Sequence, residues 1–153
     1  MKPPLMTWKP SVTVAAVMER DGRFLLVEEE DGGERVYNQP AGHWERDETL
    51  VQACAREVLE ESAHRFEPKQ LVGVYRWSRP QGDLAYLRFA FCGEILGVEE
   101  GRALDQGILR AVWLSPEEIR QLVPRHRSPL VWHCVEDYLA GKRYPLELIT
   151  HYA

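Results

Sequence analysis

Residues 42–63 read GHWERDETLVQACAREVLEESA, and no other stretch of the chain is as informative. Apolar side chains recur in it at the spacing of one helical face, which predicts a helix from Thr49 to about Ser62. On such a helix Glu57, Glu60 and Glu61 occupy positions i, i+3 and i+4, so their carboxylates share one face. The segment therefore combines a helical core pattern with three crowded acids.

This crowding is unfavourable for a helix by itself. Each like-charge pair at these spacings costs roughly 0.2–0.5 kcal/mol, and the dipole near the end of a helix also disfavours negative charge. Carboxylate oxygens are ligands that Mg²⁺ and Mn²⁺ prefer, and a divalent cation would turn the repulsion into attraction. Two interpretations follow: a solvated acidic face, which is the usual one for an isolated E-x-x-E-E helix, and a metal site.

The net charge of the chain is concentrated in the same stretch. The 153 residues include 24 acids and 19 lysines and arginines, which gives a net charge of −5. Six acids and two bases lie within residues 42–63, so this segment holds four of the five excess negative charges. The rest of the chain is nearly neutral, and general nucleic-acid binding is therefore not expected.

The remaining composition is that of an ordinary globular protein, and we expect a single domain over residues 1–153. No apolar run reaches the length of a membrane helix, and the first residues lack the apolar core of a signal peptide, so no membrane association is expected. Three widely separated cysteines argue against a disulfide scaffold and favour a cytoplasmic location.

Predicted strands and helices alternate along the chain without the regular period of a βαβ repeat. We expect strands at 12–18, 24–27, 71–77, 85–95 and 108–114, and helices at 115–122 and 129–139 in addition to 49–62. Residues 36–44 should be irregular or a short edge strand, and the acidic residues 28–34 a solvated loop. This order predicts an α/β fold with a mixed sheet covered by helices.

The spacing of the charged residues in 42–63 resembles the Nudix box, G-x5-E-x7-R-E-U-x-E-E-x-G-U, in which U is a bulky apolar residue. Two positions depart from it, because Ala63 replaces the glycine and His64 replaces the last apolar residue. That glycine often has a positive φ, so alanine there either costs about 1 kcal/mol or lets the helix run on by one residue. The matching positions are Gly42, Glu48, Arg56, Glu57, Val58, Glu60 and Glu61.

Segments outside the box extend the resemblance from about residue 10 to residue 140. They are similar to the NudJ-type phosphatase branch of the Nudix hydrolases, and they comprise residues 38–43, 86–89, 113–118 and 127–131. The resemblance implies the Nudix fold, in which a mixed β-sheet is sandwiched between helices in an α/β/α arrangement.

The resemblance also implies a metal site and roles for the box residues. Glu57, Glu60 and Glu61 would be ligands of Mg²⁺, with Mn²⁺ as the alternative ion, and Arg56 would pair with a box carboxylate and orient it. The metal would activate a water for attack on phosphorus. Either Glu57 or Glu60 would accept the proton of that water, which makes Arg56, Glu57 and Glu60 the candidate catalytic residues. The residues that would support the loop and helix geometry are Gly42 and Glu48.

Residues outside the helix are candidates for binding the substrate. Arg88 lies in an apolar strand, where a charge is expensive, and a phosphate, a box carboxylate or an acid at the edge of the core would explain it. His43 and Arg127 are the other candidates for phosphate contact. Asp105 is the nearest candidate for an additional acid, although a solvated loop acid is the more usual role. Aromatic residues that would stack on a substrate ring, or pack in the protein, are Tyr37, Trp44, Tyr75 and Trp77.

The resemblance implies a Mg²⁺-dependent hydrolase that cleaves phosphate anhydrides in nucleoside di- and triphosphates or in small organic pyrophosphates, those of thiamine metabolism included. The alternatives are a Nudix-fold nucleotide-binding or sensor domain without turnover, and a pyrophosphohydrolase of a nucleotide sugar or an oxidised nucleotide. The expected partner is a small phosphorylated substrate, and the protein is expected to be a monomer or a small homo-oligomer.

Overall fold

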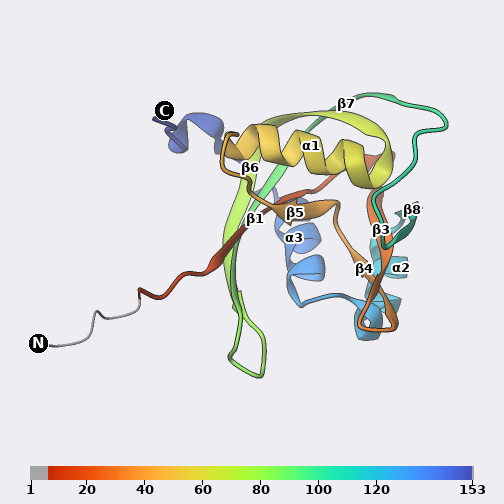
Figure 1. The fold of residues 1–153 in the computed structure, drawn as a ribbon. Coiled ribbons are helices and arrows are strands. Elements are labelled where there is room, and N and C mark those ends of the chain that lie inside the picture. The colour runs from red at the N-terminus through yellow and green to blue at the C-terminus, as the bar shows by residue number, and fades with distance from the viewer. Residues whose placement is uncertain (1–6, 153) are drawn as a thin grey trace, which may run out of the picture.

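A computed structural model describes residues 7–152 of the chain (Figure 1). Its α-helices are α1 (Leu50–Ser62), α2 (Pro116–Gln121) and α3 (Leu130–Leu139), with short 3₁₀ turns η1 (Val123–Arg125) and η2 (Leu146–Leu148). Its strands are β1 (Ser11–Ala16), β2 (Glu19–Arg20), β3 (Arg23–Asp31), β4 (Glu34–Asn38), β5 (Ala41–His43), β6 (His64–Ser78), β7 (Ala85–Val98), β8 (Ile108–Leu114) and β9 (Tyr144–Pro145). No helix of the described residues is long and apolar enough to cross a membrane.

The strands form two sheets. The larger sheet has the order β5-β1-β7-β6-β9 and is mixed, because β1 runs parallel to β7 while the other neighbours are antiparallel. The second sheet is antiparallel and places β3 between β4 and β8, with β2 paired to the start of β3. The mixed sheet confirms the α/β prediction, whereas the second sheet was not predicted.

The mixed sheet separates two hydrophobic cores. Alternate residues of β6 point to opposite faces, since Leu71 belongs to the core under α1 and Val72 to the core under α3. The same alternation holds in β7, where Phe91 faces α1 and Ala90 faces α3. Helices therefore cover both faces of the sheet, as expected for the α/β/α arrangement (Figure 1).

The prediction of a solvated loop at residues 28–34 was wrong. Most of this segment continues β3 and turns at Gly32 and Gly33, both with positive φ, into β4. Glu28 and Glu29 are buried, with exposed fractions of 6% and 7%. Their burial is compensated by arginines from distant segments, and such partners cannot be identified from local composition.

Other predicted elements are present with different bounds. Residues 36–44 do contain a short edge strand, since β5 lies at the end of the mixed sheet. The predicted strands 71–77 and 85–95 are parts of the longer strands β6 and β7, which form one hairpin across three register shifts. At each shift the pairing is locally interrupted and then resumes, so the hairpin bends without ending there.

Candidate active site

Helix α1 begins and ends with defined backbone geometry. The Thr49 hydroxyl accepts from the Gln52 backbone N–H at 3.1 Å, and the Gln52 side chain accepts from the Thr49 N–H at 2.9 Å, which forms a capping box. At the other end Ala63 has φ 59° and donates its N–H to Leu59. Alanine therefore adopts the left-handed conformation at the box-glycine position, and the helix does not run on.

His64 replaces the apolar residue that ends the box pattern, and it is buried at the start of β6. Its ring lies edge-on to Trp113 at 6.0 Å between centroids, and its Nδ1 is 2.7 Å from the Ser62 carbonyl oxygen. His64 thus makes an aromatic contact at the position where the box pattern has a bulky apolar residue.

Arg56 connects the acids of the helix to the preceding loop. Its Nε and Nη2 donate to the two oxygens of Glu48 at 2.9 and 2.7 Å, and Nη2 also donates to the His43 carbonyl. Its Nη1 donates to Glu57 at 2.9 Å and to Glu60 at 2.7 Å. Arg56 holds the pKa of Glu48 below its usual value, so this pair remains charged and fixes the loop to the helix.

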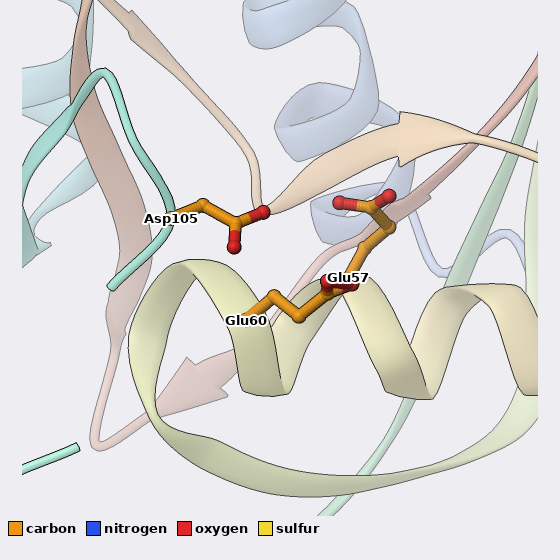
Figure 2. A group of neighbouring side chains, drawn as sticks. All are labelled: Glu57, Glu60 and Asp105. Atoms are coloured by element: carbon orange, nitrogen blue, oxygen red, sulfur yellow. The ribbon is translucent and has the colours of Figure 1, made fainter. Parts of the chain in front are cut away.

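Three carboxylates converge beside this arginine. Oxygens of Glu57, Glu60 and Asp105 lie within 4.8 Å of one another. Figure 2 shows Glu57 and Glu60 extending from α1 and Asp105 from the loop before β8. The Asp105 backbone N–H donates to the Glu60 carbonyl at 2.9 Å, which holds the loop against the helix. Asp105 is exposed, as expected of a loop acid, and it also reaches the acids of α1.

Glu61 does not belong to this group of three, although the charges of Glu57 and Asp105 act on its carboxylate. Its Oε1 accepts from the Ala41 N–H at 2.9 Å, and the side chain is buried against β5. Gly42 lies next to Ala41, and a Cβ atom there would overlap the carboxylate of Glu57. Glycine at this position therefore leaves the space that the Glu57 carboxylate occupies.

Burial changes the acidity of these groups. Burial raises the pKa of Glu57 to about 7, against the lowering effect of Arg56, and it raises the pKa of Glu61 to about 8. Burial and the neighbouring Glu60 also raise the pKa of Asp105. Hard oxygen donors whose negative charges repel one another are a suitable environment for a small divalent cation, which would stabilise their ionised forms.

A cavity of about 370 Å³ lies against these acids. Glu57 and Glu61 line it, as do His43, Arg88 and Arg127, the three residues predicted to bind the substrate. The fold thus brings side chains from β5, β7 and the segment before α3 together at this cavity. The cavity has both acids and cations in its wall, a composition compatible with a divalent cation and an anionic group bound side by side.

The two arginines of the cavity differ in their partners. Arg127 donates to the buried Glu29 at 2.6 Å. Arg88 donates to the amide oxygens of Asn38 and Gln39, both at 2.9 Å, and neither a box carboxylate nor a core-edge acid pairs with it within residues 7–152. Sequence reasoning missed Glu29, whose place in a strand became evident only from the pairing of β3 with β4 and β8.

One of the predicted aromatic residues lines the cavity. Trp77 does so together with Tyr86, its cross-strand neighbour, and their rings stack at 5.9 Å with 18° between planes. Tyr37 is buried in the core on the α3 side, Tyr75 donates to Asp137, and Trp44 donates to the Glu48 carbonyl. Trp77 and Tyr86 therefore form the aromatic part of the cavity wall.

Comparison with known proteins assigns the chain to a family. The family model described as NUDIX domain matches residues 7–133. The chain belongs to the Nudix family, and it is a hydrolase of that family, as the resemblance of the box implied. The extension of a single domain over the full 1–153 stays a prediction.

The relatives of this chain cover almost all of its length. Phosphatase NudJ of Escherichia coli strain K12 is 43% identical over 142 residues, which are 93% of this chain and 92% of that protein. A NUDIX hydrolase from Nitrosomonas europaea has a structure with TM-score 0.91 and 52% identity, covering 94% of this chain and 98% of that one. The solution structure of the E. coli ORF135 protein is similar with TM-score 0.71 and 26% identity, covering 90% of this chain and 94% of that one.

Proposed function

We propose that the protein is a Mg²⁺-dependent hydrolase of phosphate anhydrides, acting on nucleoside di- or triphosphates or on small organic pyrophosphates such as those of thiamine metabolism. The observation that supports this most directly is the position of Glu57. Its carboxylate belongs to the group formed with Glu60 and Asp105, and it also lines the cavity that contains Arg88 and Arg127. A single side chain thus joins a cation site to a substrate site.

The acids present suit Mg²⁺ or Mn²⁺. Glu57, Glu60 and Asp105 would hold the ion, and Glu61 lies close enough to the same cavity to hold an ion there as well. When bound, the ion would neutralise phosphate oxygens and increase the acidity of a coordinated water. Glu61 was expected in this set from the resemblance, and Asp105 was the candidate for an additional acid; the distance of its oxygens from those of Glu57 and Glu60 supports including it.

The protein's own residues would orient the reaction. Arg56 holds Glu57 and Glu60 at fixed positions, so that either carboxylate can accept a proton from an attacking water. Arg88, His43 and Arg127, which line the same cavity, would bind the phosphoryl oxygens. Trp77 and Tyr86 offer an aromatic surface for the remainder of the substrate.

Phosphate release with Mg²⁺ from a panel of nucleotides and organic pyrophosphates tests this proposal. In Glu57→Gln and Glu60→Gln the rate should fall by at least about a hundredfold, because a catalytic metal supplies several kcal/mol of barrier lowering. Glu117→Gln is the matched control, since Glu117 is an exposed acid of α2 and should leave the rate unchanged. Activity of the two box variants within a factor of about two of wild type would contradict the assignment.

The same panel separates the alternatives. Release of orthophosphate rather than pyrophosphate supports the phosphatase activity that the NudJ relatives are named for, and pyrophosphate release supports a pyrophosphohydrolase of nucleotide sugars or oxidised nucleotides. Tight binding without turnover of any compound would identify a sensor domain. A cytoplasmic location, which the three free cysteines favour, is part of the same proposal.

A further inference from the structure

Arg88 is a buried cation whose hydrogen-bond partners are all neutral. Only 6% of its surface is exposed. Its Nη1 donates to the Gln39 amide oxygen and lies 3.8 Å from the Cys134 sulfur, and its Nη2 donates to the Asn38 amide oxygen. A buried charge without a counter-ion is costly, so this arrangement is unusual for a residue with a structural role only.

The other arginines near the cavity have acidic partners. Arg56 pairs with glutamates of the box, and Arg127 pairs with Glu29. Across residues 7–152 Arg88 forms no such ion pair. An amide oxygen fixes the direction of a guanidinium without cancelling its charge, whereas a carboxylate does both. The positive charge of Arg88 therefore remains available to an anion in the cavity.

The two amides are themselves held by the fold. Asn38 ends β4 and lines the cavity beside Arg88. Gln39 is almost fully buried at 1% exposure, and its Nε2 donates to the Val131 carbonyl in the first turn of α3 at 2.8 Å. Gln39 thus connects the guanidinium to α3, and Asn38 connects it to the second sheet. The position of Arg88 is determined from two sides.

We propose that Asn38 and Gln39 are positioning residues, which hold Arg88 toward the cavity and keep its charge free for an anionic phosphoryl group of the substrate. This inference rests on the proposed function, which supplies the anion. It adds a reason for amides at these two positions: a carboxylate in either place would retain the hydrogen bond to Arg88 and still weaken substrate binding.

Two substitutions of Asn38 separate this role from a structural one. Asn38→Asp keeps the size and the acceptor oxygen but adds a negative charge, and Asn38→Ala removes the acceptor without adding charge. A structural role predicts that Asp is the milder change, because it preserves the hydrogen bond to Arg88. The proposal predicts that Asn38→Asp binds substrate more weakly than Asn38→Ala. A negative charge next to the Arg88 guanidinium should change substrate affinity by about ten- to hundredfold.

The measurement is steady-state hydrolysis of a nucleoside diphosphate with Mg²⁺, together with urea unfolding of each variant. Asn38→Asp should raise KM about ten- to hundredfold with kcat within about threefold of wild type, and Asn38→Ala should raise KM less. The urea midpoint of Asn38→Asp should equal or exceed that of wild type, since the new pair with Arg88 is charged. Gln121→Glu, an exposed amide-to-acid change on α2, controls for the added charge.

Calorimetric binding of α,β-methylene-ADP distinguishes the failure of this inference from the failure of the proposed function. Weaker binding to Asn38→Asp than to Asn38→Ala supports the inference even if the wild type hydrolyses nothing. Equal KM and equal binding for Asn38→Asp and wild type, in an enzyme that does hydrolyse the substrate, overturns the inference alone. A larger loss in Asn38→Ala than in Asn38→Asp also overturns it.

Discussion

Replacement of Gly42 by alanine should disturb one carboxylate and little else. Gly42 lies in β5, pairs with Val14 of β1 and does not have a positive φ, so its backbone accepts an alanine. The new Cβ would overlap the carbon and both oxygens of the Glu57 carboxylate. The perturbation is thus the addition of one methyl group directly against a proposed metal ligand.

The size of the effect follows from this overlap. The Glu57 carboxylate must move by roughly 1 Å to restore an ordinary van der Waals contact. This movement also breaks its 2.9 Å hydrogen bond from Arg56. Overpacking of this kind costs about 1–3 kcal/mol of unfolding free energy, and a displacement of about 1 Å in a reacting group costs about a hundredfold in rate. We therefore expect Gly42→Ala to lower both the unfolding free energy and the rate of hydrolysis.

A double-mutant cycle with Glu57→Ala isolates the contact, with urea unfolding of the metal-free protein as the measurement. In the Glu57→Ala background the obstruction is absent, so Gly42→Ala should change the unfolding free energy by less than about 0.5 kcal/mol. The coupling between the two positions should be about 1–3 kcal/mol. Equal costs of Gly42→Ala in both backgrounds would refute the reasoning, because the strain would then come from the strand and not from Glu57.

Three further outcomes are expected. Ala63→Gly should raise the unfolding free energy by up to about 1 kcal/mol in urea titrations, because glycine adopts the left-handed conformation without strain, and a loss would contradict this. The metal-free protein should lose stability as pH rises from about 4.5 through 7 to 8, because Glu57 and Glu61 have raised pKa values when folded, so Mg²⁺ should increase Tm more at pH 8 than at pH 6. All three cysteines are buried, so they should react with a thiol reagent only at the rate of unfolding; rapid labelling of the native protein would show that one is accessible.

Predictions from sequence succeeded where a local pattern determines the structure. The 3.6-residue period predicted α1 with its observed bounds to within one residue, and the structure shows that Thr49 caps its start. Ile108–Leu114 is a strand as predicted, and the serine at 115 caps α2 through Glu118. In these elements the residues that set the structure lie within a few positions of one another, so the information is present in a short window.

The failures concern residues whose environment comes from distant segments. Glu28 was predicted to be solvated, yet it is buried and forms ion pairs with Arg110 and Arg125. Both arginines lie more than 80 positions away along the chain. Asp105 was only a candidate for an additional acid, with a solvated loop acid as the more usual role, because its proximity to Glu60 depends on the connection between β7 and β8 and not on a local pattern. A single sequence gives the charge of such residues but not their partners.

The arginines around the site illustrate why the partner matters as much as the residue. Arg56 forms ion pairs with four glutamates of the helix and the preceding loop. Its charge is therefore neutralised within the protein, and it is suited to hold these carboxylates in place. Arg127 is paired with Glu29 at 2.6 Å and lies 4.0 Å from Asp31, so it would bind a phosphate only in competition with these acids. Arg88 has amide partners and is free to bind an anion without such competition. Arg88→Lys should therefore reduce substrate affinity more than Arg127→Lys does, because only the first loses an uncompensated, rigidly held guanidinium.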